Sequence, residues 1–208
     1  MTEAGEPLAS LRAIRKDYGS VRVLNGVDFD VHPGRVLAVM GHNGAGKSTL
    51  MQILAGTTPR SGGTIALAGA ATAEPYDADR AQSLGVRCVF QELSLCPNLT
   101  VTENTRLVHP ALRGRGWRRR ARALILAKLD EIYPGHGIDP DTPVADLSIA
   151  HRQVIETARA FTATDRPLRI VILDEPTSAL DVRSAGQLLA HMRRAAAQGI
   201  AVLFISHR

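Results

Sequence analysis

The chain has 208 residues, a hydrophobic fraction of 45%, a charged fraction of 22% and a formal net charge of +5. This composition is typical of a globular protein of one domain, or one domain with a sub-lobe. It excludes a membrane-spanning protein, because no run approaches the roughly 20 apolar residues that a spanning helix needs. The first ten residues lack the apolar segment of a secretory signal, and two cysteines, Cys88 and Cys96, predict reduced thiols in a cytosolic protein.

Small strands are predicted between Leu11 and Val31, where short apolar stretches alternate with turn signals at residues 18–20 and 25–26. Tyr18 lies in the first of these turns. Its ring could stack on a nucleotide base, but a tyrosine in such a place is more often a half-buried strand residue.

A phosphate-binding loop is predicted at residues 41–49, which match the pattern G-x-x-x-x-G-K-[ST] in full. The apolar run 36–40 predicts a strand before the loop, and the helical spacing of Leu50, Ile53 and Leu54 predicts a helix after it. Glycines let successive backbone N–H groups point at one anion, and the helix adds the positive end of its dipole. A glycine-rich turn without a ligand is the alternative, which the strand–helix setting disfavours.

A helical lobe inserted into an α/β core is predicted after the strand that ends at Phe90. Thr100 and Glu103 form a capping-box pattern, and residues 117–132 and 149–161 have helical periodicity. The buried face of the helix at 117–132 is expected to comprise Leu124, Ile125, Lys128, Leu129 and Ile132.

Six arginines form a basic run in this lobe. Such a run is usually a solvated helix face, and the alternative is contact with anionic lipid headgroups. The run consists of Arg113, Arg115, Arg118, Arg119, Arg120 and Arg122.

An apolar strand at residues 170–173 ends in two acids, Asp174 and Glu175. Such a strand places a carboxylate at the carboxyl edge of a parallel sheet, where P-loop ATPases hold Mg²⁺, and the adjacent acid can polarise the attacking water.

A helix is predicted at residues 185–197, with Ser184 at its start and Gly199 past its end. A buried strand is predicted at residues 200–205, and His207 lies just beyond it.

Residues 170–181, IVILDEPTSALD, resemble the Walker B motif and D-loop of ABC transporter ATPases. The other motifs of that family occur in the family's order, so the resemblance covers essentially the whole chain. Tyr18 matches the adenine-stacking aromatic, and Gln91 matches the glutamine of the Q-loop. Residues 147–151 occupy the signature position, and His207 matches the switch histidine.

The resemblance implies an α/β fold: a P-loop NTPase core, mainly a parallel sheet with flanking helices, plus small N-terminal antiparallel strands and an inserted helical subdomain. It implies that residues 1–208 form one cassette, incomplete at the C-terminus. Residues 1–91 and 162–208 would be the nucleotide-binding core, and residues 92–161 the helical subdomain with the signature.

ATP and Mg²⁺ are the cofactors that the resemblance implies, and it also assigns roles to individual residues. Glu175 would be the general base, with His207, Gln91 and Lys47 as the other catalytic residues. Mg²⁺ would be held by Ser48, Gln91 and Asp174. The nucleotide would be bound by Tyr18, Gly41, Asn43, Gly44, Ala45, Gly46, Lys47, Ser48 and Thr49, and in trans by Ser148 and Ala150 of a partner cassette.

Residues 90–104 and 139–150 resemble the monosaccharide importers, whose ATPase subunit usually carries two cassettes in one polypeptide. The signature departs from the general Leu-Ser-Gly-Gly-Gln. Ile149 and Ala150 are familiar in the sugar-importer branch, and His151 is less usual.

The function implied is that of the ATP-hydrolysing subunit of a sugar importer, at the cytoplasmic face of the cell membrane. Its partners would be membrane permease subunits, a second cassette and, indirectly, a sugar-binding protein, with no nucleic acid. One alternative is an ABC ATPase that acts without a permease, but the stretch from Gln91 to Ser148 has no room for a long linker or coiled coil. The other is a non-hydrolysing regulatory cassette, which Glu175 argues against.

Overall fold

Two four-stranded sheets organise the residues that the computed structural model describes, which are 6–42 and 44–206. One sheet is antiparallel, in the order β2-β1-β4-β5, and the other is parallel, in the order β3-β8-β7-β6. The antiparallel sheet consists of β1 (Ala9–Tyr18), β2 (Val21–Val31), β4 (Gly62–Leu67) and β5 (Ala70–Ala71). The parallel sheet consists of β3 (Val36–Val39), β6 (Val86–Val89), β7 (Ile170–Asp174) and β8 (Ala201–Ile205).

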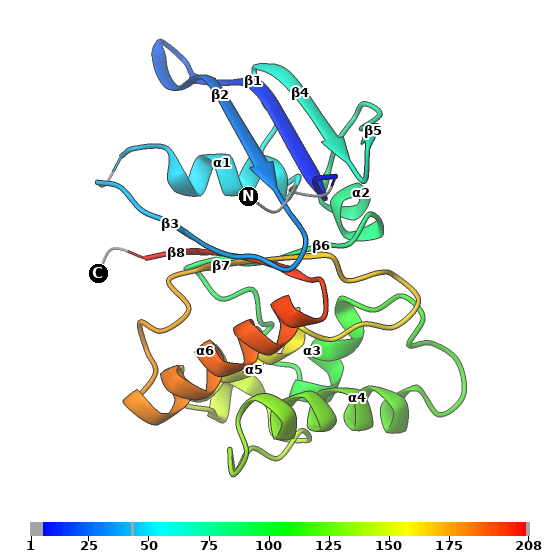
Figure 1. Ribbon diagram of the computed structural model, residues 1–208. Helices are drawn as coiled ribbons and strands as arrows, with labels where there is room; N and C mark the ends of the chain where they lie inside the picture. The colour runs from blue at the N-terminus through cyan, green and yellow to red at the C-terminus, as the bar shows by residue number, and fades with distance from the viewer. Residues whose placement is uncertain (1–5, 43, 207–208) are drawn as a thin grey trace.

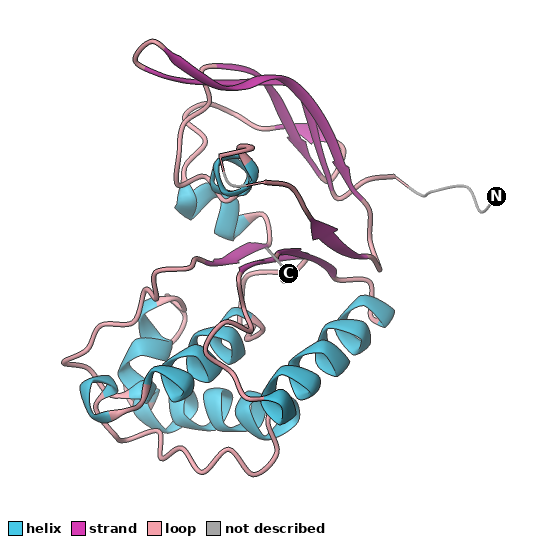
Figure 2. Ribbon diagram, turned by 90° about the vertical axis from the view of Figure 1, so that its left-hand side faces the viewer, coloured by secondary structure: helices cyan, strands magenta, loops and turns pink. Residues whose placement is uncertain are grey.

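The helices lie in two layers on either side of the parallel sheet (Figures 1 and 2). On one side α1 and α2 lie between the two sheets, and on the other side α3 to α6 cover the parallel sheet. No helix in the described part of the chain is both long and apolar enough to cross a membrane. The helices are α1 (Lys47–Leu54), α2 (Ala78–Ser83), α3 (Val101–Leu107), α4 (Trp117–Ile132), α5 (Ile149–Ala160) and α6 (Val182–Ala197), with a 3-10 turn at Val144–Asp146.

Strand β7 divides its side chains between two hydrophobic cores. Ile170 and Ile172 belong to the core shared with the antiparallel sheet and α1, and Val171 and Leu173 belong to the core under the helical layer. Successive side chains of a strand point to opposite faces, so a strand covered on both faces must be apolar throughout. This is why β7 is an uninterrupted apolar run up to its last residue, Asp174.

The structure confirms the expected α/β class and several of the predicted elements. The helix Trp117–Ile132 has the predicted bounds. The capping box is present, since the Thr100 side chain accepts from the Glu103 N–H while the Glu103 carboxylate accepts from the Thr100 N–H. The buried residues of α4 are Ala121, Ile125, Leu129 and Ile132. The expected buried face includes Leu124 and Lys128, which are only half-buried, and it does not include Ala121.

Two predictions about boundaries are wrong. The predicted turn at residues 25–26 lies inside β2, where the ladder with β1 slips at a bulge and Gly26 has a φ of +74°. A left-handed glycine is what such a bulge needs, so the same Asn-Gly pair serves a bulge instead of a turn. Helix α6 begins at Val182 rather than Ala185, because the Asp181 side chain, and not Ser184, caps it.

His191 on α6 is the least satisfied buried side chain of the helical layer. It is only 3% exposed and packs edge-on against Phe161 at a centroid distance of 4.6 Å. Among the described residues neither ring nitrogen has a hydrogen-bond partner, although Nδ1 lies 3.4 Å from the Glu131 carboxylate. Burial lowers the pKa of His191 to about 4, against the pull of Glu131.

We therefore expect acid to destabilise the protein through His191. The unfolded form takes up the proton near pH 6.5, whereas the folded form resists until about pH 4, so stability is intact above pH 6.5 and falls between those values. At pH 5 this effect of His191 lowers the free energy of unfolding by roughly 2 kcal/mol. In urea titrations His191→Leu should lose less stability than the wild type between pH 7 and pH 5. The control His151→Leu should lose as much stability as the wild type. If His191→Leu also lost as much stability as the wild type over this pH range, the expectation would be contradicted.

Candidate nucleotide site

The loop between β3 and α1 is shaped by glycines in left-handed conformations. Gly44 has a φ of +81° and Gly46, which precedes the first residue of α1, a φ of +82°. A Cβ on Gly46 would stand 2.7 Å from Cδ2 of Leu24, so only glycine allows the loop to pass this close to β2. The loop therefore presents backbone rather than side chains to whatever lies in front of α1.

Lys47 lies along this loop instead of extending into solvent. It is 8% exposed, and its ammonium donates to the carbonyl oxygens of Gly41, at 2.6 Å, and His42, at 2.9 Å. An ammonium has three donors, so these two bonds leave one for an anion. Asn43 lies outside the described residues, and the side chain of His42 does not line the cavity described next.

A cavity of about 520 Å³ opens in front of α1. It brings together three segments that are far apart in the sequence: the phosphate-binding loop, Gln91 and Glu175. The expected residues Gly44 to Thr49 all line it. Val23 of β2 lines it too, a contribution that no sequence motif signals.

The carboxyl end of β7 supplies the acids. Asp174 is 7% exposed and pairs in parallel register with Ile205 of β8. Glu175 follows in a left-handed conformation, with a φ of +49°, and its N–H donates to the Ile205 carbonyl at 3.2 Å. Non-glycine residues rarely adopt this conformation, and it redirects the Glu175 side chain from the line of the strand to the cavity.

The loop and acids fit ATP with Mg²⁺. A cradle of backbone N–H groups and one lysine suits phosphates, while the Ser48 hydroxyl and the Gln91 amide, which line the cavity, are oxygen ligands of the kind that Mg²⁺ prefers. The Asp174 carboxylate is a third such ligand, but the residue is buried and does not itself line the cavity. The thiol of Cys88 does not compete with these oxygen atoms for Mg²⁺, because it stays protonated. Burial raises the pKa of Cys88, and the Asp174 and Glu156 carboxylates raise it further.

Other predicted site residues lie elsewhere. Tyr18, 48% exposed beside the hairpin turn, does not line the cavity, and the Lys16 ammonium stands 4.7 Å from its ring centroid. Ser148 is exposed at the start of α5, where its hydroxyl accepts from the His151 N–H at 3.2 Å. Ala150 lines a separate cavity of about 190 Å³. His207 lies outside the described residues.

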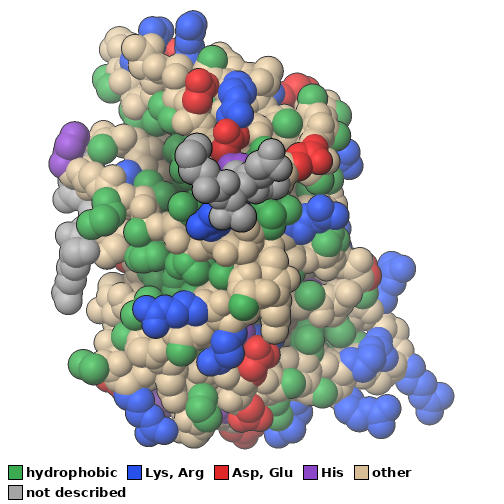
Figure 3. Space-filling view, viewed as in Figure 1, with side chains coloured by type: hydrophobic (Ala, Val, Ile, Leu, Met, Phe, Trp, Pro, Cys, Tyr) green, Lys and Arg blue, Asp and Glu red, His purple; other side chains and the backbone are tan. Residues whose placement is uncertain are grey.

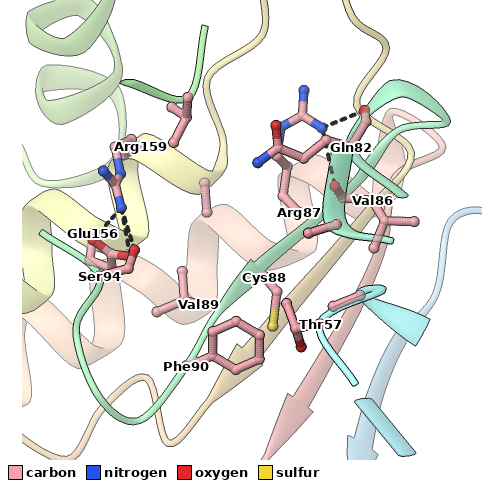
Figure 4. A pocket seen from close by; sticks show the side chains of 14 residues that line it. Thr57, Gln82, Val86, Arg87, Cys88, Val89, Phe90, Ser94, Glu156 and Arg159 are labelled. Atoms are coloured by element: carbon pink, nitrogen blue, oxygen red, sulfur yellow. Dashed lines mark hydrogen bonds and ion pairs between the residues drawn. The ribbon is translucent and has the colours of Figure 1, made fainter. Parts of the chain in front are cut away.

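A second cleft, of about 160 Å³, is lined by residues of α2, β6 and α5 (Figure 4). Phe90 and Ser94, which flank the segment containing Gln91, line it together with Glu156 and Arg159 of α5. The Ser94 hydroxyl donates to Glu156 at 2.5 Å and accepts from Arg159 at 2.7 Å, and Arg159 also donates to Glu156 at 2.8 Å. Glu156 and Arg159 are buried and Ser94 is exposed, so this triad ties the surface segment after Gln91 to the helix that Ser148 begins.

Comparison with known proteins places these features in a family. Residues 24–178 match the family described as ABC transporter. A ribose import ATP-binding protein of Rhizobium meliloti is 41% identical over 203 residues, which are 97% of this chain and 38% of that protein. A ribose import ATP-binding protein of Rubrobacter xylanophilus is also 41% identical, over 97% of this chain and 39% of its own length. The chain thus spans about two fifths of the relatives that it matches.

Solved structures agree with the fold. An ATP-binding subunit of an ABC transporter superposes with a TM-score of 0.77 at 26% identity, covering 96% of this chain and 79% of that one. A dimeric ATP-binding cassette in a post-hydrolysis state, bound to ADP and Pi, superposes with a TM-score of 0.78 over 96% of this chain and 88% of that one. Its sequence is 24% identical, so this likeness is evidence for the fold alone. The family match, the identity to the import proteins and the arrangement of the phosphate loop and acids agree, and the chain belongs to the ABC transporter family.

Proposed function

We propose that the chain binds ATP with Mg²⁺ and hydrolyses it as the ATP-binding part of a sugar importer. The observation that carries the proposal is the single cavity lined by the phosphate loop, Gln91 and Glu175. Lys47 and the loop amides would hold the phosphates, and Ser48, Gln91 and Asp174 would hold Mg²⁺, which when bound would neutralise charge on the phosphates. Glu175 would take the proton of the attacking water, and His207 would contact the γ-phosphate.

A second cassette completes the site in this proposal. Ser148 and Ala150 lie away from the cavity that holds the phosphate loop of their own chain, and Ser148 is exposed at the start of α5. This placement supports a head-to-tail pair, in which each signature closes the nucleotide of the other cassette. Tyr18 would stack on the adenine through the ring face opposite the Lys16 ammonium, since the side chain is half-exposed.

Permease subunits are the proposed membrane partners, docked near Gln91 and the helical subdomain of residues 92–161. The cleft beside Phe90 and Ser94 supports this, because its walls come from both the core of residues 1–91 and 162–208 and the helical subdomain. The cytoplasmic face of the membrane is the proposed location. Sugar as the cargo rests on the names of the relatives, and a sugar-binding protein would deliver it to the permease.

Asp174→Asn tests the metal site. The substitution keeps the size of the side chain and removes the charge that would face Mg²⁺, so ATP affinity should lose most of its dependence on Mg²⁺. Calorimetric titrations of ATP with Mg²⁺ and with EDTA measure this dependence. Asp181→Asn, at the exposed start of α6, is the matched control and should keep it. An Asp174→Asn protein with the Mg²⁺ dependence of the wild type would refute the assignment.

A further inference from the structure

The positive charge of the chain is concentrated in one segment. Residues 104–129 contain seven arginines, one lysine and no aspartate or glutamate, a formal charge of +8, while the whole chain carries +5. The rest of the chain is therefore net negative, by three charges. Figure 3 shows the basic side chains projecting at the lower right, where Figure 1 places the loop before α4 and the first turn of that helix.

Some of these arginines form ion pairs or hydrogen bonds with other residues of the chain. Arg118 pairs with Glu103 at 2.8 Å, and Arg122 pairs with Asp141 at 3.2 Å. Arg120 donates to the carbonyl oxygens of Arg113, at 2.7 Å, and Arg115, at 3.0 Å. The guanidinium of Arg120 thus holds the preceding loop against the first turn of α4.

Three arginines have no such role. Arg113, Arg115 and Arg119 are exposed, and none has an ion pair within the described residues. Because Arg120 folds the loop onto the helix, these three side chains start from neighbouring points of the backbone. We call Arg113, Arg115 and Arg119 the arginine patch.

The position of the patch is unfavourable for the isolated protein. The N-terminus of α4 has the positive end of the helix dipole, no acidic residue in its first turn and no side-chain cap. Cations there destabilise a helix by about 0.3–1 kcal/mol each. Beside the patch, the guanidiniums of Arg106 and Arg118 stand over the Trp117 ring, 4.3 Å and 5.1 Å from its centroid, and Leu107 is 56% exposed.

We propose that the arginine patch binds the anionic headgroups of a lipid bilayer. Clusters of arginine are attracted to anionic leaflets, and a tryptophan and an exposed leucine beside them suit the interface between headgroups and acyl chains. A long nucleic acid fits less well, since it would extend beyond the patch over a surface that is net negative. A bilayer can be touched at this one projecting corner. The proposal goes beyond ATP hydrolysis and does not depend on it.

Co-sedimentation with vesicles tests the proposal on the whole chain without nucleotide. The probes are vesicles of phosphatidylcholine alone and vesicles of equal parts phosphatidylcholine and phosphatidylglycerol. The wild type should bind the anionic vesicles only, and salt should weaken the binding. Replacing Arg113, Arg115 and Arg119 with glutamine should lower the partition coefficient by roughly a hundredfold, because each basic residue near an anionic surface contributes about fivefold.

The matched control replaces Arg35, Arg80 and Arg193 with glutamine, three exposed arginines outside the segment, and has the same net charge. It should bind like the wild type, and circular dichroism should show that both variants are folded. Equal losses in the two variants, or no binding by the wild type, would overturn the proposal. So would a preference of the patch for double-stranded DNA over anionic vesicles in competition.

Discussion

Lys47→Ala is expected to weaken ATP binding by roughly 10- to 150-fold, because Lys47 is the cation of the phosphate loop and a hydrogen bond to a charged group is worth about 1.5–3 kcal/mol. The side chain is already held beside the cavity by the carbonyl oxygens of Gly41 and His42, so the ammonium needs little reordering to meet a phosphate. Calorimetric titration of the chain with ATP and Mg²⁺ measures the effect.

Two further variants separate loss of charge from loss of structure. Lys47→Met keeps the stem of the buried side chain and should bind ATP as poorly as Lys47→Ala. Lys128→Ala, which removes a lysine paired with Glu131 on α4, should bind ATP like the wild type. ATP affinity that is unchanged in Lys47→Ala would remove the phosphate-loop assignment.

Glu175→Gln is expected to keep ATP affinity and to slow hydrolysis by about a hundredfold or more, the usual scale for loss of a general base. Glutamine has the same shape and hydrogen-bonding reach, but it cannot accept the proton of the attacking water. The left-handed backbone at Glu175 is shared by both variants, so the substitution does not change the local strain.

Phosphate release at saturating ATP measures the rate, and titration measures the affinity. Glu92→Gln is the matched control, since Glu92 is exposed beside Gln91 and does not line the cavity. Turnover of Glu175→Gln close to the wild-type rate would show that another group is the base.

The parts of the site that depend on local sequence could be predicted. The loop follows from glycines that alone allow left-handed turns, as the contact between Gly46 and Leu24 shows, and from the apolar strand before it. Asp174 follows from the apolar run of β7. In both cases the residues that matter are neighbours in sequence, so a motif contains the physical cause.

The parts that depend on packing between distant segments could not be predicted. Val23 lines the cavity because β2 passes beside the loop, and nothing near Val23 in the sequence signals this. The triad of Ser94, Glu156 and Arg159 has the same origin, since it joins the segment after Gln91 to α5. Helix α2 was not predicted, because its six residues are too few to show a period and only the Asp77 cap marks its start.

Turnover measured across about a hundredfold dilution tests the central claim, that the cavity is half of a site which a second cassette closes. Ser148 lies exposed and outside the cavity. On the proposed account the 208-residue chain needs Ser148 of another copy, and a separate copy lacks the effective concentration that a tether provides. We predict slow hydrolysis by dilute protein, a rate per molecule that rises with protein concentration, and a dimer in sedimentation when ATP and Mg²⁺ are present. A high rate per molecule that does not depend on concentration, from a protein that sediments as a monomer, would contradict the account.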